Sequence, residues 1–391
     1  MQLTLNATIA PSPFNPGSPV DPNDFIGRAQ ELENFQHKLR QTSEGSLASI
    51  SVAGGYGIGK TSFLHKCKKI SEDYNALTVY FSLNELSTID KVSLSKAILE
   101  RLKEKVREET ILKRLSGSIF EALKRIKMVA GNIELSYNGD NEKAFPNLHA
   151  ALSATWNELK KSKKAIVFLI DEAGVLEKNK AELIMYLRAI LEQLQTERVP
   201  VMIVLGGKFI TSASSGSGFS PIVRTFPPAI LDNFSRAESD QFIKRKLNQT
   251  QINISEDALN KIYQVTEGHP FITSSYMGSV YLKRSPQEKE IKSIHLTAAD
   301  IDFVRRTLAP FFSRFYDNVG KNSRKILQCI ASDGGETSML KLTQSLGKEN
   351  YQISPYIAKL TQDGAIIRKE RGEYKLFHKL FSKYIMEHQP I

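Results

Sequence analysis

The strongest chemical signal in the chain is a glycine-rich segment, GGYGIGKT, at residues 54–61. Its Gly54, Gly59, Lys60 and Thr61 match the pattern G-x-x-x-x-G-K-[ST]. In such a loop the backbone N–H groups point at a phosphate, and the N-terminus of the following helix adds positive potential. We expect Lys60 to neutralise β- and γ-phosphate oxygens and Thr61 to ligate Mg²⁺. The residues expected to surround the nucleotide are Gly54, Gly55, Tyr56, Gly57, Ile58, Gly59, Lys60, Thr61 and Ser62.

A second segment, AIVFLIDE at residues 165–172, is an apolar run that ends abruptly in two carboxylates. Asp171 is typical of an aspartate that holds Mg²⁺ through the water shell of the ion. Glu172 fits a general base that polarises an attacking water molecule. Acidic residues often begin loops, so the pair alone is weak evidence for a metal site. Together with the glycine loop upstream it becomes strong evidence. Together the two segments predict binding of ATP and Mg²⁺, with hydrolysis assisted by Glu172 and Lys60.

Both segments stand where an apolar strand is expected to end. Residues 47–53 (LASISVA) predict a buried strand before the glycine loop, and a helix is expected from Lys60 to about residue 71. Further strands are expected at 77–83, 165–170 and 199–205, with helical segments between them. This alternation favours a parallel sheet with helices on both faces, which binds ligands at the carboxyl ends of its strands. The predicted fold class is therefore α/β of the P-loop type, and an ordinary glycine turn is the disfavoured alternative.

The rest of the chain predicts three further parts around this core. Residues 1–24 are rich in Pro, Ser and Asn and indicate an extended arm without a core of its own. Residues 25–230 carry the strands, which we expect to stop after Pro227-Pro228. Residues 231–320 predict a small helical bundle that opens with a capping box of Ser235 and Glu238. Residues 321–391 predict a separate last unit.

Two short motifs carry a resemblance to a known group. Phe25-Ile26-Gly27-Arg28 with Glu31-Leu32 resembles the box that opens AAA+ ATPases of the archaeal-type, Orc1/Cdc6-like and STAND groups. Gly268-His269-Pro270 resembles the GxP signature in the helical lid of STAND ATPases. The resemblance implies that Gly27 and Arg28 lie near the adenine and ribose. It also implies that His269 and Pro270 close over the base from the lid.

The same resemblance raises two further expectations about hydrolysis. Arg224, in SPIVRTF, matches the place of an arginine that reaches the γ-phosphate of a neighbouring subunit, although a solvated loop arginine is the alternative. The strand at 199–205 is expected to end in a polar residue that orients the attacking water. Gly206-Gly207 stands there instead, which puts the rate of hydrolysis in question and leaves nucleotide binding unaffected.

The C-terminal part indicates a module for a partner. Apolar-faced helices are expected at 323–331, 339–346 and 352–362, and an alternating segment at 364–376 turns at Arg371-Gly372. Three helices and a β-hairpin are the winged-helix pattern, and this part has 12 Lys/Arg against 7 Asp/Glu. On DNA the third helix would enter the major groove, while the hairpin would meet phosphates or the minor groove. Protein docking is the alternative. The residues expected to face DNA are Tyr351, Gln352, Ser354, Tyr356, Lys359, Arg368, Lys369 and Arg371.

Bulk properties limit the classes of protein and partner. The net charge of +11 favours an acidic partner such as nucleic acid, although a basic protein with no such partner is equally compatible. The chain has two cysteines, Cys67 and Cys329, with no disulfide framework or metal-ligand spacing. The apolar runs are too short to cross a membrane and the N-terminus lacks the pattern of a signal peptide. We therefore expect a cytoplasmic protein.

The leading functional hypothesis is an ATP-driven switch or motor that assembles on double-stranded DNA as a nucleotide-dependent homo-oligomer. Replication, transposition and defence against phage all suit this design, and protein partners are expected in each. An alternative is a nucleotide-gated adaptor with little turnover, whose winged helix binds a protein. A transcription regulator with a vestigial P-loop is disfavoured because Lys60, Thr61, Asp171 and Glu172 are all present.

Overall fold

The computed structural model describes residues 11–85, 89–113, 144–178, 182–207, 225–285, 287–296, 303 and 307–388. The chain divides into two compact units. The sheet unit comprises residues 19–54 and 59–231, and the helical unit comprises residues up to Ser18, residues 55–58 and residues 232–391. Among the described residues, no helix is both long and apolar enough to cross a membrane.

A five-stranded sheet forms the centre of the sheet unit, with the strand order β2-β3-β4-β1-β5. All neighbouring strands are parallel. The strands are β1 (Ile50–Gly54), β2 (Leu77–Ser82), β3 (Ile166–Asp171), β4 (Val201–Gly206) and β5 (Pro228–Leu231). The prediction that strands stop after Pro227-Pro228 is wrong, because β5 pairs with β1 at the edge of the sheet. Pro228 is the first residue of this edge strand, a position where a missing N–H is tolerated.

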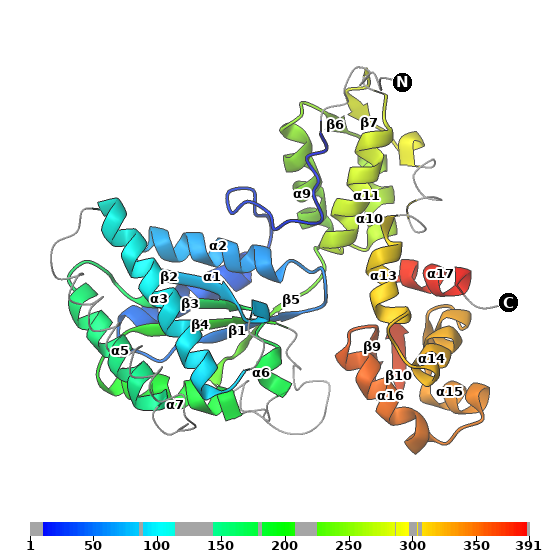
Figure 1. The fold of residues 1–391 in the computed structure, drawn as a ribbon. Helices are drawn as coiled ribbons and strands as arrows, with labels where there is room; N and C mark the ends of the chain where they lie inside the picture. The colour runs from blue at the N-terminus through cyan, green and yellow to red at the C-terminus, as the bar shows by residue number, and fades with distance from the viewer. Residues whose placement is uncertain are drawn as a thin grey trace, which may run out of the picture. The chain divides into compact units, whose positions relative to one another are not determined.

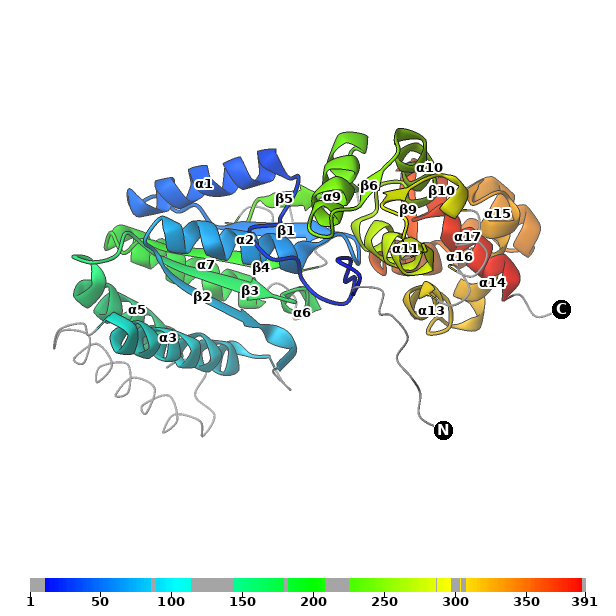
Figure 2. The ribbon, with the colours of Figure 1, turned by 90° about the horizontal axis from the view of Figure 1, so that it is seen from above.

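Helices cover both faces of this sheet (Figure 1). On one face lie α1 (Ala29–Ser43) and α2 (Lys60–Asp73), and on the other lie α3 (Lys91–Lys113), α5 (Ala144–Leu159) and α7 (Glu182–Thr196) (Figure 2). The side chains of β2 alternate between these faces, since Leu77, Val79 and Phe81 belong to the core cluster under α3, α5 and α7. The short elements η1 (Leu83–Glu85) and α6 (Val175–Lys178) follow β2 and β3. The expected α/β P-loop fold class is confirmed.

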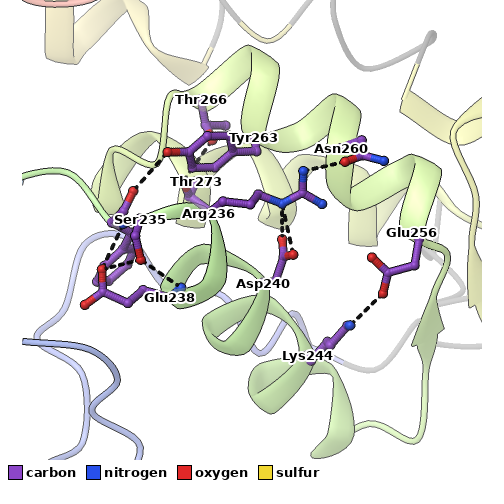
Figure 3. Close-up of polar contacts among 11 residues, drawn as sticks. Ser235, Arg236, Glu238, Asp240, Lys244, Glu256, Asn260, Tyr263, Thr266 and Thr273 are labelled. Atoms are coloured by element: carbon purple, nitrogen blue, oxygen red, sulfur yellow. Dashed lines mark hydrogen bonds and ion pairs between the residues drawn. The ribbon is translucent and has the colours of Figure 1, made fainter. Parts of the chain in front are cut away.

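The helical unit contains three helices in succession after the sheet. They are α9 (Arg236–Asn248), α10 (Glu256–Thr266) and α11 (Pro270–Lys283), followed by α13 (Ala309–Tyr316). A two-stranded parallel sheet of β6 (Asn253–Ile254) and β7 (Glu290–Ile291) lies beside them. The predicted capping box is confirmed: Ser235 accepts a hydrogen bond from the Glu238 N–H, and the Glu238 carboxylate accepts one from the Ser235 N–H (Figure 3).

Polar contacts join α9 to α10 across the surface of this bundle (Figure 3). The Arg236 Nε donates to both carboxylate oxygens of Asp240 at 2.9 Å, and its guanidinium also reaches Asn260. Lys244 pairs with Glu256 at 2.7 Å. Such exposed pairs contribute little to stability. The packing of the bundle therefore depends on its buried apolar side chains, among them Ile243, Leu259 and Ile262.

The described part of the N-terminal arm is associated with both units. Phe14 is 4% exposed and packs edge-on against Phe242 of α9, with ring centroids 6.0 Å apart. In the sheet unit, the Val20 N–H donates to the Ser62 hydroxyl at 3.1 Å, and the Lys66 ammonium donates to the Pro22 carbonyl at 2.9 Å. Among its described residues, Phe14 thus packs on α9 of the helical unit, and Val20 and Pro22 bond to side chains of α2 in the sheet unit.

The C-terminal region combines helices with a small antiparallel sheet of order β8-β10-β9. Its elements are α14 (Lys321–Ser332), β8 (Glu336–Ser338), α15 (Met339–Leu346), α16 (Asn350–Gln362), β9 (Ile366–Glu370), β10 (Glu373–Leu376) and α17 (Lys379–Glu387). The three expected helices and the hairpin are present, and Gly372 at its turn has φ 87°. The third of these helices, expected at 352–362, begins two residues earlier, and Pro355 lies inside it.

Gly268, between α10 and α11, has both a positive φ and a close neighbour, whereas Gly347 has a positive φ alone. Comparing the two positions separates the cost of a steric clash from the cost of the backbone conformation. A Cβ added there would lie 2.1 Å from the Phe234 carbonyl oxygen, and φ is +69°. Gly347, which ends α15, has a similar φ of +59°, and its added Cβ meets no described atom within 4 Å. Gly347→Ala should cost about 1–2 kcal/mol through φ alone. Gly268→Ala should cost roughly 1–3 kcal/mol more, because the chain must move to relieve the clash.

Thermal unfolding of the two variants beside the wild type measures this difference. The apparent melting temperature should fall further in Gly268→Ala than in Gly347→Ala. Equal shifts would show that the close approach of residues 268 and 234 does not constrain the helical unit.

Candidate nucleotide and magnesium site

Two side chains from different segments meet at the carboxyl edge of the sheet. The Thr61 hydroxyl, in the first turn of α2, donates to Asp171 Oδ2 at the end of β3 over 2.8 Å. The Lys60 ammonium donates to the Gly54 carbonyl oxygen over 3.1 Å, at the end of β1. Gly59 precedes α2 with φ 96°, a conformation that glycine adopts without strain. The structure thus brings Lys60, Thr61 and Asp171 to one edge.

The hydroxyl and carboxylate oxygens of this edge fit a magnesium ion. Mg²⁺ prefers oxygen ligands and keeps several of its waters, so one hydroxyl and one carboxylate are a usual protein contribution. Asp171 is 5% exposed, and its Oδ1 accepts a hydrogen bond from the Glu172 N–H at 2.8 Å. The described residues include no cluster of three or more His, Cys, Asp or Glu side chains suited to a metal. A magnesium ion here would therefore depend on Thr61, Asp171 and the phosphates of a nucleotide.

Glu172 leaves the strand in an unusual conformation. Its φ is +52°, and its side chain is exposed. The following N–H, of Ala173, donates to the Gly206 carbonyl oxygen of β4 at 2.7 Å. This left-handed residue turns the chain directly after Asp171 and leaves the Glu172 carboxylate accessible to water.

Gly206 stands where a polar residue is expected to orient water, and its surroundings explain the glycine. A Cβ at this position would lie 2.6 Å from Leu64 Cδ1 and 3.2 Å from Asp171 Oδ1. A side chain at Gly206 would require the Leu64 or Asp171 side chain to shift. The glycine at this position therefore matches the close packing of Leu64, on α2, against the end of β4.

The sequence analysis did not identify two further residues at this edge. The Tyr80 hydroxyl, on β2, donates to Asp171 Oδ2 at 3.1 Å. The His65 ring packs edge-on against the Tyr80 ring at a centroid distance of 4.9 Å. Burial, and secondarily Lys68, lower the pKa of His65, while Asp171 acts in the opposite direction. His65 lies one turn after Thr61, so helical spacing is the one signal that would have drawn attention to it.

The Gly27-Arg28 motif forms a left-handed turn before α1. Gly27 has φ 73° and Arg28 has φ 61°, and the Arg28 side chain is only 6% exposed. The Arg28 carbonyl oxygen accepts the Leu32 N–H at 2.9 Å, which begins the helix. The described structure thus gives this motif a role in starting α1, and its expected place beside adenine and ribose stays a prediction.

Within the helical unit, the tip of the glycine loop packs against α11 and α13. The Phe271 N–H donates to the Gly57 carbonyl oxygen at 3.2 Å. Gly57 has φ +75°, and a Cβ there would lie 2.8 Å from the Phe271 Cβ. The Tyr56 ring lies 5.5 Å from the Phe311 ring and 4.1 Å from the Arg314 guanidinium carbon, a cation–π distance. Loop tip and α13 are thus in direct contact.

Gly268-His269-Pro270 forms the start of α11. Pro270 occupies the first turn, where its missing N–H costs nothing, and the His269 Nδ1 accepts the Ile272 N–H at 3.4 Å. The His269 ring is 5% exposed and lies 5.9 Å from the Phe311 ring. These contacts are enough to explain the motif locally. Its expected action on the nucleotide base stays a prediction.

The C-terminal region is attached to the same helices through His378. This ring is buried, with Nε2 at 3.0 Å from the Thr266 carbonyl oxygen and Nδ1 accepting the Leu380 N–H at 3.1 Å. The hydrogen therefore lies on Nε2, and burial lowers the pKa of His378. Lys379 reaches the Gln264 carbonyl oxygen and lies 3.7 Å from Glu267. Phe377 adds ring contacts with Phe311, Phe312 and Phe315.

The residues expected to face nucleic acid lie on α16 and on the β9–β10 hairpin. Gln352, Lys359, Arg368, Lys369 and Arg371 are exposed, and Ser354 is half-buried. Some of them already have local partners: Gln352 caps α16 through the Glu349 N–H, Ser354 bonds to Asn350, and Lys369 pairs with Glu336 at 2.5 Å. Arg224 lies outside the described residues.

Gly206→Ala tests whether the edge of the sheet tolerates a side chain beside Asp171. The added methyl group should displace Leu64 or Asp171, and we expect turnover of ATP to fall roughly 10- to 100-fold, as displaced catalytic groups do. Steady-state phosphate release measures this effect. Gly320→Ala is the control, because its added Cβ meets no described atom within 4 Å. Turnover as in wild type for Gly206→Ala would contradict the steric argument.

Several known proteins are similar to this chain. The chain is 21% identical to an uncharacterized HTH-type transcriptional regulator of Methanocaldococcus jannaschii, over 94% of this chain and 91% of the relative. Its structure is similar to a Walker-type ATPase of Pyrococcus abyssi, with a TM-score of 0.61 and 14% identity over 96% of this chain and 99% of that one. The Orc1 protein of Aeropyrum pernix, solved in complex with DNA, gives a TM-score of 0.47 and 14% identity over 94% and 93% of the two chains.

The expected resemblance to archaeal-type ATPases is also tested at the level of the family. Residues 25–272, more than half of the chain, match an ATPase domain that occurs predominantly in Archaea. That span includes the glycine loop, Asp171-Glu172 and Gly268-His269-Pro270. The chain therefore belongs to the family of archaeal-type ATPase domains.

Proposed function

We propose that this ATPase is a nucleotide-driven switch of the AAA+/STAND type that binds double-stranded DNA through a C-terminal winged helix. The observation that carries the ATPase part is the contact between Thr61 and Asp171 beside Lys60. The observation that supports the switch is the contact of the glycine-loop tip with α13. The DNA part is supported by the exposed basic residues of α16 and the hairpin.

In the proposed reaction each residue at the edge of the sheet has one task. Lys60 exchanges its contact with the Gly54 carbonyl for the β- and γ-phosphate oxygens. Thr61 and Asp171 hold a magnesium ion, which neutralises charge on the phosphates. The exposed Glu172 carboxylate accepts a proton from the attacking water. Arg224 of a neighbouring copy is proposed to stabilise charge on the γ-phosphate.

The proposed coupling starts at Tyr56. A nucleotide in the glycine loop is proposed to change the backbone conformation on either side of Tyr56. The Tyr56 ring contacts Phe311 and Arg314, which both belong to α13. Phe311 in turn contacts Phe377, beside the buried His378 that attaches the C-terminal region to α10. These contacts support transmission from the loop to the C-terminal region by way of two discrete packings of α13.

The winged-helix proposal is based on the order of elements and on charge. A helix, a short strand, two further helices and a β-hairpin follow one another, and α16 presents Tyr351 at 75% exposure. The relative in Methanocaldococcus jannaschii is named as an HTH-type regulator, which supports the same assignment. We propose that Lys359 and Arg371 contact phosphates, and that Gln352 reads base edges.

A nucleotide-gated adaptor is the second candidate. Gly206 leaves the water-orienting position without a polar side chain, which favours slow turnover. In that case the C-terminal region would bind a protein, and ATP would control its release from α10 and α13. Cytoplasmic location, homo-oligomerisation and protein partners belong to both proposals as expectations.

Glu172→Gln separates the two candidates. The amide keeps the size of the side chain and cannot accept the proton, so ATP should still bind while turnover falls about 10²- to 10⁴-fold. Equilibrium binding of ATP and single-turnover hydrolysis, measured on the same preparation, test this expectation. Equal turnover in the variant and the wild type, each no faster than Lys60→Ala, would favour the adaptor.

The DNA proposal predicts a salt-dependent effect of specific lysine and arginine residues. Replacing Lys359 and Arg371 by Ala should weaken binding to duplex DNA and lower the slope of log K against log salt by about one for each lost phosphate contact. Lys383→Ala is the matched control, because Lys383 belongs to α17, outside α16 and the β9–β10 hairpin, and is accessible to solvent. DNA should also raise ATP turnover at low salt. An unchanged slope in the double variant would contradict this interface.

A further inference from the structure

We propose that Tyr80 is a positioning residue for magnesium binding: its hydroxyl holds Asp171 in the orientation that receives the ion. The proposal rests on the assignment of Asp171 to magnesium given above. It adds a residue from β2, a strand that carries none of the sequence motifs of the site. Strand register, the hydrogen-bond capacity of the carboxylate and the packing of His65 all support this role.

Strand register brings Tyr80 close to Asp171. In the parallel pairing of β2 with β3, Tyr80 lies opposite Leu169 and Ser82 lies opposite Asp171. Side chains two residues apart on a strand point to the same face, so Tyr80 and Asp171 both point toward α2. The long Tyr80 side chain spans the offset of two residues, and its hydroxyl reaches Asp171 Oδ2 at 3.1 Å. A shorter side chain at this position would not reach.

The carboxylate has four acceptor positions, and donors among the described residues use three of them. Glu172 N–H occupies one on Oδ1 at 2.8 Å. Thr61 and Tyr80 hydroxyls occupy both on Oδ2, at 2.8 and 3.1 Å. One position on Oδ1 is left for a water molecule bound to magnesium. The three donors therefore fix both the rotation of the carboxylate and the direction of its remaining lone pair.

Removing one donor has a specific consequence. Without the Tyr80 hydroxyl, Oδ2 would be held by Thr61 alone, and Thr61 must also offer a lone pair to the ion. The carboxylate would then rotate more freely about its Cβ–Cγ bond. Magnesium binding would have to remove this rotational freedom each time, which would weaken the affinity for the ion. Partners that orient a metal ligand commonly affect metal affinity in this way.

His65 contacts the tyrosine from α2, the helix that also carries Thr61. Its ring meets the Tyr80 ring edge-on at 4.9 Å, and it stands four residues after Thr61 on the same face of α2. Thr61 and His65 thus approach Asp171 and Tyr80 from one helix. The helix whose hydroxyl contacts the carboxylate therefore also packs against the tyrosine ring.

Tyr80→Phe in the full chain tests the proposal, because it removes the hydroxyl and keeps the ring. The readout is ATP affinity measured by calorimetry in EDTA and at rising Mg²⁺. We expect the Mg²⁺ concentration for half-maximal tightening to rise about tenfold. Affinity in EDTA and the melting temperature without nucleotide should stay at the values of the control Tyr74→Phe. That control removes a similar half-buried hydroxyl, 2.9 Å from Ser43.

Asp171→Asn distinguishes failure of this proposal from failure of the site. If Asp171→Asn abolishes the Mg²⁺ effect and Tyr80→Phe matches Tyr74→Phe, the site stands and the role of Tyr80 is overturned. If Asp171→Asn keeps the Mg²⁺ effect, the site assignment fails and the proposal fails with it. A Tyr80→Phe variant that loses ATP affinity equally in EDTA and Mg²⁺ would also overturn the proposal, because a general disturbance gives that result.

Discussion

A nearly enclosed carboxylate loses its hydration and must accept hydrogen bonds from the protein instead. At the edge of the sheet, Asp171 imposes this requirement on the residues around it. Three donors from three segments meet it: the Thr61 hydroxyl, the Tyr80 hydroxyl and the Glu172 N–H. The last of these comes from the residue that follows Asp171 in the chain, and Glu172 itself adopts a left-handed conformation with an exposed side chain. Asp171 and Glu172 are thus neighbours in sequence with opposite surroundings, one nearly enclosed and the other accessible to water.

The strand order imposes a further constraint on this edge. β4 lies between β3, which ends in Asp171, and β1, which runs into the glycine loop. The end of β4 therefore lies between Asp171 and the glycine loop, and α2 packs against it from one face of the sheet. Gly206 satisfies this constraint because Leu64 and Asp171 leave no room for a Cβ. The lack of a polar side chain is thus compatible with the contact between Thr61 and Asp171 at this edge.

Local patterns predicted most of this architecture, and long-range contacts account for what was missed. Glycine spacing, apolar runs and helical periodicity are local, so the parallel sheet, α2 and the C-terminal hairpin could be predicted from sequence. β5 was missed because Pro227-Pro228 reads as a break, whereas an edge strand tolerates proline in its first position. Tyr80 was missed because its role depends on the register between β2 and β3, which a single sequence does not specify.

The tip of the glycine loop, residues 55–58, belongs to the helical unit and is closely packed there. Gly57 has no space for a side chain beside Phe271, and Tyr56 contacts Phe311 and Arg314. A change in the conformation of the tip within this unit would therefore displace α11 or α13. These contacts are the physical basis of the proposed coupling between nucleotide binding and the C-terminal region.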